Sequence, residues 1–497
     1  MSPVSDSPRA SRLRRRPARS PRTATGRRPS ASRKEQFTPI RREKALSRLP
    51  GRPSQRPPPS GVPDAADRAV VPQHLFPIVG VGASAGGLEA FRQLLGALAV
   101  DTGLAYVLVQ HLDPRHESIL AELLSESTGM DVSEVKGAVR VEANRIYVIP
   151  PAQDIVFADG LLKLVPRQTS GTHMPIDSFL QSLADAQGSQ SIGVILSGMG
   201  SDGTLGLEAI KAEGGITLAQ EPRSAKNEDM PRSAIAAGCV DFVLAPEEIA
   251  RELTRLGRHP YVAATESHDS LSSDAQTRAG LAEIVTILLK ATGADFTAYK
   301  TTTLERRIAR RMAIRRIETL EDYARHLETD KEEAEALYQD CLISVTSFFR
   351  DAEAFDSLRE NVLAPLLAGR PADSPIRVWV PGCASGEEAY SIAMLLLEAA
   401  GSRSDGPPFQ IFGTDLSDHA LKKARAGLYL DNITQHVTPE RLERFFSQVD
   451  GRYQVNKGIR DLCVFARHDL TRDPPFSRMD LISCRNVLIY LKPRLQE

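Results

Sequence analysis

The sequence predicts an α/β chain in which two parallel-sheet units flank a stretch of helices. From Phe76 onward, short apolar runs alternate with helical stretches, a pattern typical of a mostly parallel, doubly wound sheet. Residues 279–368 instead place apolar side chains three and four positions apart and show no strand signal. From Arg377 the pattern of strand, glycine loop, helix and strand returns. These three observations together predict the fold class.

The chain begins with a basic, proline-rich segment. Residues 1–62 hold 17 Lys or Arg, 3 Asp or Glu and 11 Pro. The segment therefore carries +14 (17 − 3), which leaves −15 (−1 − 14) for the rest of a chain whose net charge is −1. Its few large apolar side chains cannot offset the entropy lost on ordering. We expect residues 1–75 to be a disordered leader, and we favour a solvated tail over a specific binder of nucleic acid or anionic lipid.

The composition also bears on cellular location and on metal binding. No run of about 18 uncharged apolar residues is present, and the Arg-crowded start lacks the apolar stretch of a secretory signal. We therefore expect a cytoplasmic protein without membrane insertion. The cysteines form no C-x-x-C pair and have no His at metal-ligand spacing, so we expect reduced thiols and no metal site. They are Cys239, Cys341, Cys383, Cys463 and Cys484.

The first α/β unit is expected to span residues 76–255. Small polar residues follow it and predict a linker over residues 256–278. Within the unit, apolar spacing predicts a helix over residues 88–98. The expected strands are residues 78–81, 105–109, 145–149, 192–196, 216–219 and 240–244.

A tight turn follows the first expected strand and holds a serine. Ser84 lies in Gly-Ala-Ser-Ala-Gly-Gly, where its hydroxyl is exposed beside backbone N–H groups at the start of a helix. Taken alone, the turn fits a dinucleotide-binding loop equally well. The next strand, however, ends in Gln110 and His111, where a nicotinamide fold usually places an acid for the ribose. His111 could take the proton of Ser84, because strand ends of such sheets converge on one crevice.

A third polar group follows the strand expected over residues 192–196. Asp202 lies in Ser-Gly-Met-Gly-Ser-Asp-Gly, where the glycines free the backbone and the acid faces the same sheet edge. An Asp-Gly pair is also an ordinary turn signal. Beside Ser84 and His111, Asp202 would orient the imidazole and stabilise its cation. The sequence therefore predicts a nucleophilic site with these three residues.

Several motifs of this unit, in order, resemble the CheB methylesterase domain. The resemblance implies that Ser84 is the nucleophile, His111 the base and Asp202 the orienting acid. It implies hydrolysis of glutamate γ-methyl esters to glutamate and methanol, together with deamidation of glutamine. The motifs are Gly82-Ala-Ser-Ala-Gly-Gly, Gln110-His111, Ile149-Pro-Pro, His173-Met-Pro-Ile-Asp177 and Leu196-Ser-Gly-Met-Gly-Ser-Asp-Gly.

The same resemblance assigns further positions and shows two departures. Backbone groups near Met199 and Ala85 would supply oxyanion donors, and His173 would line the substrate site. CheB proteins usually have Thr where this chain has Ala85, so a hydroxyl is lost while the backbone N–H is kept. They also carry an N-terminal receiver domain, which residues 1–75 cannot form. We therefore do not expect activation by phosphorylation in cis.

The helical stretch contains an arginine-rich segment over residues 304–316. Leu304, Ile308 and Met312 recur at intervals of four and predict an inward stripe. The intervening arginines are expected on outer faces, where they would suit an acidic helical partner or remain solvated. They are Arg307, Arg310, Arg311 and Arg315.

A second glycine turn opens the last unit. The strand expected over residues 377–380 runs into Gly382-Cys-Ala-Ser-Gly-Glu387-Glu388 and a helix. Consecutive glutamates at a helix start would oppose a pyrophosphate but tolerate a cationic ligand such as S-adenosylmethionine. The next strand ends at Asp415, whose carboxylate could accept hydrogen bonds from both ribose hydroxyls. A capped glycine turn without a ligand is the alternative.

This last part resembles CheR, an S-adenosylmethionine-dependent methyltransferase of protein glutamates. The resemblance rests on Ser344-Val-Thr-Ser-Phe-Phe-Arg, Gly382 to Glu388, Gly413-Thr-Asp and Asp480-Leu-Ile-Ser-Cys-Arg-Asn-Val-Leu-Ile-Tyr. It implies an N-terminal helical domain over residues 279–368, a methyltransferase domain over 369–497, and methyl transfer bordered by Arg350 and Tyr490. Catalysis would come mainly from holding carboxylate and sulfonium in line. The implied cofactor contacts are Ser344, Thr346, Arg350, Glu388, Asp415, Asp469, Leu470, Arg485 and Asn486.

The two resemblances imply an enzyme that reversibly methylates chemoreceptors or related signalling proteins. The methyltransferase domain is expected to be incomplete, because this class has seven strands and four are expected here: 377–380, 410–413, 462–466 and 480–484. We attribute this to truncation of a longer chain or to a defective second enzyme. A signalling scaffold that binds acidic receptor helices without turnover is the alternative function.

Overall fold

The computed structural model describes residues 76–112, 118–167, 173–263, 275–342, 345–368, 370–401 and 406–496. These residues belong to one compact unit. The predicted disordered leader, the middle of the expected linker and Ser344 lie outside the described residues. Among the described residues, no helix has the length and apolar character needed to cross a membrane.

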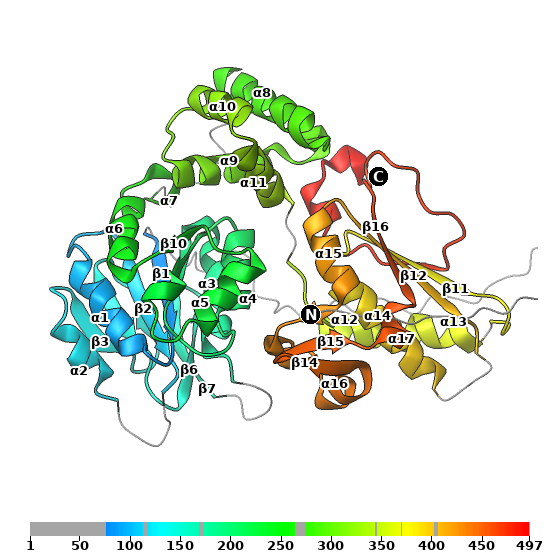
Figure 1. The fold of residues 1–497 in the computed structure, drawn as a ribbon, viewed down its shortest axis with the longest axis horizontal. Coiled ribbons are helices and arrows are strands. Elements are labelled where there is room, and N and C mark those ends of the chain that lie inside the picture. The colour runs from blue at the N-terminus through cyan, green and yellow to red at the C-terminus, as the bar shows by residue number, and fades with distance from the viewer. Residues whose placement is uncertain are drawn as a thin grey trace, which may run out of the picture. The chain divides into compact units, whose positions relative to one another are not determined.

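A parallel sheet forms the first unit, as expected, but it has seven strands in place of six, because Asp131–Glu134 was not expected as a strand (Figure 1). Its order is β10-β9-β8-β1-β2-β5-β3, and β1 (Ile78–Ala83) lies at its centre. The chain proceeds from β1 to β2 on one side and returns to β8 on the other, so β1 marks a topological switch point where ligand sites usually form. The other strands are β2 (Ala105–Gln110), β3 (Asp131–Glu134), β5 (Arg145–Val148), β8 (Ser191–Ile195), β9 (Ile216–Gln220) and β10 (Phe242–Leu244).

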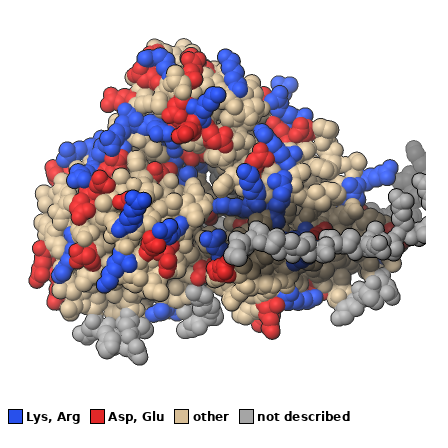
Figure 2. All heavy atoms as spheres, in the orientation of Figure 1, with Lys and Arg blue, Asp and Glu red and all other residues tan. Residues whose placement is uncertain are grey.

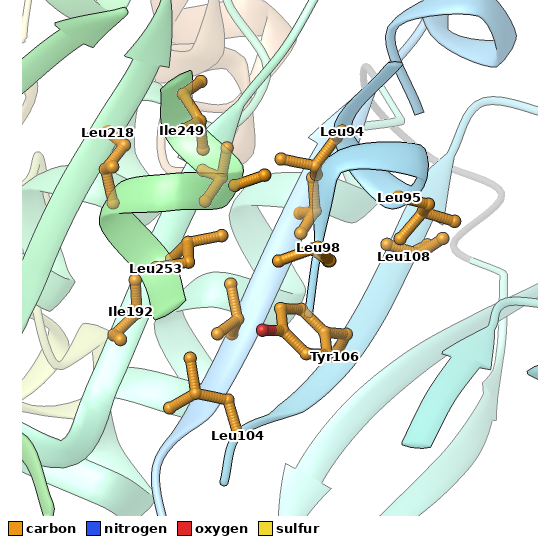
Figure 3. Packing of buried hydrophobic residues seen from close by; sticks show 14 of the residues in the cluster. Leu94, Leu95, Leu98, Leu104, Tyr106, Leu108, Ile192, Leu218, Ile249 and Leu253 are labelled. Carbon is orange, nitrogen blue, oxygen red and sulfur yellow. The ribbon is translucent and has the colours of Figure 1, made fainter. Parts of the chain in front are cut away.

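Helices cover both faces of this sheet. On one face, α1 (Gly87–Ala97) and α6 (Pro246–Gly257) bury side chains such as Leu94 and Leu253 against Tyr106 of β2 (Figure 3). On the other, α3 (Pro175–Gln187) and α4 (Thr204–Ala212) bury a second cluster. Each fully buried Leu contributes roughly 1.5–3 kcal/mol. The remaining helical segments are α2 (Leu120–Ser125), η2 (Gly188–Gln190), η3 (Pro222–Ser224), α5 (Asp229–Ala237) and α7 (Pro260–Ala263).

Some elements of this unit were not expected from the sequence. A three-stranded antiparallel sheet has the order β4-β7-β6, formed by β4 (Val139–Arg140), β6 (Gln153–Ala158) and β7 (Leu161–Pro166). Asp159 and Gly160, both with positive φ, join β6 to β7. This Asp-Gly pair between apolar runs is a hairpin signal that could have been read from the sequence. Helix α7 also lies within the range expected as linker, and its Tyr261 and Val262 are buried in the core.

The described residues between 275 and 368 form helices joined by short loops and contain no strand, as expected. Its core gathers Leu304 and Ile308 of α9 with apolar residues of the neighbouring helices. Figure 1 shows these helices in green to yellow. They are α8 (Ala275–Thr292), η5 (Phe296–Ala298), α9 (Thr301–Arg315), α10 (Leu320–Thr329), α11 (Lys331–Cys341), α12 (Ala352–Leu358), η6 (Arg359–Leu363) and α13 (Ala364–Ala368).

The placement predicted for the α9 arginines is wrong. Arg307, Arg310 and Arg311 are buried, whereas Arg315 remains about 39% exposed. Arg310 is fully buried between the carboxylates of Asp241, in the first unit, and Asp340 of α11. The apolar stripe of α9 faces its own helical neighbours, whereas Arg307 and Arg310 contact the first unit. Arg311 pairs with Glu333 of α11. Periodicity identifies an apolar stripe and cannot show that the opposite face is also covered.

A second parallel sheet, of order β16-β12-β11-β17, lies in the last unit and contains the four expected strands. Its core is formed largely by α14 (Glu387–Ala400). The strands are β11 (Ile376–Pro381), β12 (Phe409–Asp415), β16 (Cys463–Arg467) and β17 (Leu481–Ile482). The other helical segments are α15 (Asp418–Ala426), η7 (Asp431–Gln435), α16 (Pro439–Phe445), α17 (Lys457–Arg460), η8 (Leu488–Tyr490) and η9 (Pro493–Leu495).

An antiparallel sheet of order β13-β15-β14 completes the last unit and was not expected. Its strands are β13 (Leu428–Tyr429), β14 (Phe446–Val449) and β15 (Arg452–Val455). On the face shown in Figure 2, acidic and basic side chains of the described residues are interspersed. This mixture gives no broad field of one sign on that face.

Candidate functional site

The first candidate site begins where β1 ends. Ser84 follows β1, and its backbone N–H donates to the Ser197 carbonyl at 3.0 Å. Gly86 then has φ 79° at the start of α1, and a Cβ there would lie 2.7 Å from Ser197 Oγ. Glycine is therefore required, because the turn combines a left-handed backbone with close approach of the loop after β8. The half-buried Ser84 hydroxyl is thus held at the carboxyl edge of the sheet.

The structure brings the three predicted residues of this site together. Ser84 Oγ lies 2.9 Å from Nδ1 of His111, and Nε2 of His111 lies 2.9 Å from Oδ2 of Asp202. The second contact has ion-pair distance but lies outside the alignment of a linear hydrogen bond. His111 is about 30% exposed and Asp202 only 2%. A hydroxyl, an imidazole and a buried carboxylate in this order can support nucleophilic catalysis.

Backbone amides hold the carboxylate of Asp202 in place. Its two oxygens accept hydrogen bonds from the N–H groups of Ile176 (3.1 Å) and Asp177 (2.9 Å) at the start of α3. These bonds and the positive end of α3 favour the negative charge that must face His111. Helix α3 therefore positions the acid of the triad.

Asp177 is a second buried acid at this site, to which the sequence assigned no role. Burial raises the pKa of its carboxyl group well above the ordinary value, and the nearby charge of Asp202 raises it further. Its Oδ1 accepts a hydrogen bond from the Gly206 N–H at 2.9 Å. Two adjacent buried carboxylates cannot both be charged cheaply, so the neutral form of Asp177 is favoured.

His173 lies near the triad. Its ring centroid is 6.2 Å from that of His111, and its Nε2 is 2.7 Å from Oδ1 of Asp154. Asp154 was not identified from the sequence, because it lies in the unexpected strand β6. An open cavity of about 490 Å³ adjoins the Ser84 hydroxyl, and Gln110, His111 and Lys226 also line it.

The last unit contacts the loop that carries Asp202. The Ser201 hydroxyl donates to the Asp431 carboxylate of η7. The neighbouring Asn432 is 1% exposed and acts to lower the pKa of Asp177. No local sequence signal marks these residues, because the contact joins segments 230 positions apart in the chain.

A second candidate site is a pocket at the carboxyl ends of β11 and β12. Arg350 and Tyr490, expected at the methyl-transfer site, both line it. Tyr299 and His468 also line it and were not identified from the sequence. Apart from Ser344, which is not described, all the expected cofactor contacts line this pocket: Thr346, Arg350, Glu388, Asp415, Asp469, Leu470, Arg485 and Asn486.

The two consecutive glutamates at the start of α14 have different environments. Glu388 lines the pocket, and burial raises the pKa of its carboxyl group while the Ser483 hydroxyl bonds its Oε1. Glu387 is not among the lining residues; burial raises its pKa to about 7, and the Ser385 hydroxyl donates to its carboxylate. The sequence argument for a cationic ligand therefore rests on Glu388 alone.

The backbone around this pocket is strained. Four non-glycine residues in or beside it adopt positive φ: Phe349 (50°), Asp351 (60°), Ala384 (46°) and Asn486 (55°). Each such conformation costs on the order of 1–3 kcal/mol and persists where surrounding structure imposes it. Such clustering is typical of ligand-binding sites.

The pocket residues fit S-adenosylmethionine. Asp415 Oδ2 accepts the Ala384 N–H at 2.9 Å and Oδ1 the Ser417 N–H at 2.8 Å, so each oxygen keeps capacity for a ribose hydroxyl. Arg350 and Arg485 offer donors for a ligand carboxylate.

The turn beside this pocket requires glycine. Gly382 has φ 68°, and a Cβ there would lie 2.3 Å from Val487 Cγ2, a clash that the segment could not accommodate without moving. The backbone of β11 can therefore approach the segment holding Arg485 and Asn486 only because position 382 lacks a side chain.

Comparison with protein families gives a match for each described part. Residues 79–253 match the CheB methylesterase model, residues 279–342 the all-alpha domain of CheR methyltransferase, and residues 344–497 its SAM binding domain. The last match identifies S-adenosylmethionine as the methyl donor of that domain.

Three curated relatives illustrate the same division. An uncharacterized 104.1 kDa protein of Rhodobacter capsulatus is 39% identical over 396 residues, 76% of this chain and 42% of that protein. A chemotaxis protein methyltransferase of Listeria monocytogenes is 34% identical over 198 residues, 40% of this chain and 73% of that protein. A putative protein-glutamate methylesterase/protein-glutamine glutaminase of Leptospira interrogans is 32% identical over 181 residues, 36% of this chain and 94% of that protein.

The chain spans less than half the length of the R. capsulatus relative but most of the length of the other two. It therefore joins, in one polypeptide, domains that occur separately in those two. The chain belongs to the CheB methylesterase and CheR methyltransferase families.

Proposed function

We propose that the first unit hydrolyses glutamate γ-methyl esters in chemoreceptor-type signalling proteins, and that the last unit forms them. The observation that carries the first half is the contact series from Ser84 to His111 to Asp202, with both distances at 2.9 Å. The cavity beside the serine leaves room for a protein side chain. The second half is supported by the pocket that gathers the described cofactor residues.

The proposed hydrolysis divides into two steps. Ser84 Oγ attacks the ester carbonyl while His111 takes its proton at Nδ1, and methanol leaves with a proton returned from the imidazole. Water then attacks the acyl-serine with the same base, which releases glutamate and restores Ser84. Asp202 stabilises the imidazolium, and the backbone N–H groups of Ala85 and Met199 are the candidate oxyanion donors.

Methanol release from a methylated receptor peptide tests the esterase. Ser84→Ala should lower the rate by at least about a thousandfold, because the nucleophile is lost. Ser125→Ala, at an exposed position on α2, is the matched control and should keep the wild-type rate. Unchanged release by Ser84→Ala would contradict the proposal and favour a scaffold that binds receptor helices without turnover.

In the last unit, S-adenosylmethionine supplies an electrophilic methyl group when it is bound. We propose that Asp415 holds the ribose hydroxyls, that Arg485 and Glu388 hold the amino-acid end, and that Arg350 and Tyr490 border the acceptor carboxylate. Thr346, Asp469, Leu470 and Asn486 would complete the lining, with Ser344 beyond the described residues. Positioning, rather than a strong base, would account for catalysis.

Calorimetric binding of S-adenosylhomocysteine tests this second assignment. Asp415→Ala should weaken binding by roughly 10- to 100-fold, because hydrogen bonds to a charged group contribute about 1.5–3 kcal/mol. Asp373→Ala, at an exposed site, is the control. Equal affinities for the two variants would show that Asp415 does not bind the ligand.

A further inference from the structure

Glu213 of the first unit lies in the pocket of the last unit. It is the residue at the C-terminus of α4, with its N–H bonded to the Ala209 carbonyl at 3.0 Å. It lines the same pocket as Arg350 and Tyr490, which border the proposed methyl-transfer site. Glu213 is half-buried. It is part of the first unit in the sequence, but its side chain lines a pocket of the last unit.

The arginines of α9 hold this end of α4 in place. Arg307 donates to the carbonyls of Lys211 (2.8 Å) and Ala212, and Arg310 Nε donates to the Gly215 carbonyl at 2.8 Å. These three carbonyls flank Glu213 along the chain on both sides. Both arginines are almost fully buried, so water does not compete for the bonds. Helix α9 thus presents the glutamate to the pocket.

The surroundings of Glu213 leave its carboxylate available. Among the residues that the structure describes, it forms no salt bridge, and its charge acts on the phenol of Tyr490. Three other acids of the pocket form bonds of their own, whereas a fourth, Asp185 of α3, is exposed. Asp415 accepts two backbone amides, Asp469 bonds Thr471, and Glu388 bonds Ser483.

We propose that Glu213 is itself a methyl acceptor of this chain, a conclusion that rests on the proposed function of the last unit. A carboxylate oxygen of Glu213 forms the new bond to the methyl carbon as the methyl–sulfur bond of S-adenosylmethionine breaks. The electron pair of that bond stays on sulfur, which yields S-adenosylhomocysteine and a neutral glutamyl methyl ester. This ester belongs to the class of substrate that the Ser84 site is proposed to hydrolyse.

Mass mapping of the full chain tests the proposal. The Ser84→Ala chain, which cannot remove the ester, is incubated with S-adenosylmethionine carrying an isotope-labelled methyl group, with a receptor peptide present. Digestion at mildly acidic pH preserves the ester. We expect label on the peptide that contains Glu213 and loss of that label in Ser84→Ala with Glu213→Gln. The matched control is Ser84→Ala with Glu122→Gln, which changes an exposed glutamate on α2. It should keep the label on the peptide that contains Glu213.

Two outcomes of the mass mapping would overturn the inference, and they are distinguishable. Label on the receptor peptide but not on Glu213 refutes self-methylation and leaves the proposed transferase intact. Absence of label from both refutes the two together. Calorimetry gives a second readout. Glu213→Gln removes a negative charge facing the sulfonium, so its affinity for S-adenosylmethionine relative to uncharged-sulfur S-adenosylhomocysteine should fall below the wild-type ratio. An unchanged ratio would place the Glu213 carboxylate away from the transferring methyl group and overturn the inference.

Discussion

At the scale of single residues, both sites depend on carboxyl groups whose pKa values are set by burial. Asp177 and Asp202 lie side by side at the first site, and burial together with the charge of Asp202 raises the pKa of Asp177. The two carboxyl groups therefore disfavour a double negative charge at this site, which favours the neutral form of Asp177. Glu387 and Glu388 likewise differ in role although they are adjacent in sequence, because only Glu388 lines the pocket.

Glu387→Gln should change how stability depends on pH. Burial raises the pKa of Glu387 from 4.5 to about 7, so its neutral form is favoured in the folded chain. The resulting stabilisation of the folded chain is fully present below the pKa of the unfolded chain, 4.5. It is lost as the pH rises through the folded-state pKa of about 7. Relative to the glutamine variant, which can still accept from Ser385, the wild type should lose up to roughly 3 kcal/mol of unfolding free energy over this interval.

Urea denaturation of both chains between pH 5 and pH 8, taken at roughly one-unit steps, provides the measurement. Ser125→Ala serves as the reference for a substitution without a buried charge. A difference between Glu387→Gln and wild type that stays constant with pH would mean that this carboxyl group titrates alike in the folded and unfolded chains.

At the scale of elements, α9 determines how the helices meet the first unit. Its apolar stripe was predicted correctly, since Leu304 and Ile308 are buried among the helices. Arg307 and Arg310 are buried as well, because they contact carbonyls at the end of α4 and the carboxylate of Asp241, just before β10. Arg310 lowers the pKa of Asp340 against the opposing effect of burial, which indicates a strong ion pair.

Arg310→Ala should therefore be strongly destabilising. It would leave the buried carboxylates of Asp241 and Asp340 without their nearest cation and with Lys211 at 3.8 and 3.6 Å, so the cost should approach the roughly 3–5 kcal/mol of a broken buried pair. Arg325→Ala, whose side chain is 75% exposed and pairs with Asp322, should cost less than about 1 kcal/mol. Thermal unfolding with calorimetric enthalpies compares the two variants. Equal losses of unfolding free energy would argue against a stabilising role for the buried ion pairs of Arg310.

At the scale of the whole molecule, the described units touch near both sites. Ser201, beside Asp202, contacts Asp431 of η7, and Lys423 of α15 donates to the Ala237 carbonyl at 2.9 Å. Glu213 meanwhile reaches the second pocket. The contacts place a part of each unit against the functional residues of the other, which gives a physical route for one activity to depend on the other.

Asp431→Ala should slow ester hydrolysis without weakening S-adenosylhomocysteine binding. The loop carrying Asp202 would lose its bond from Ser201, and a small displacement of the acid should lower kcat by roughly two- to tenfold with little change in KM. Asp461→Ala, an exposed acid of the same unit paired with Lys457, is the control. A rate equal to that of the control would show that η7 does not position the triad.

The sequence by itself determined the order of the units and most of the residues that the structure gathers at the two candidate sites. Turn glycines, strand-end polar residues and apolar periodicity are local signals, so they located Ser84, His111 and Asp202 before any packing was known. The same signals located Asp415 and the four strands of the second sheet. They missed the antiparallel strands. The two-residue strands β4 and β13 are too short to show periodicity, whereas the β6–β7 hairpin carried an Asp-Gly signal that was not used.

Only the tertiary structure decided which side chains face one another across distant segments. The acid pair of Asp177 and Asp202, the burial of Arg310 and the entry of Glu213 into the second pocket all join residues far apart in the chain. Their chemistry depends on desolvation and on the charges nearby, and neither quantity is encoded in local spacing. A sequence pattern shows which groups are present, whereas packing decides which of them share an environment.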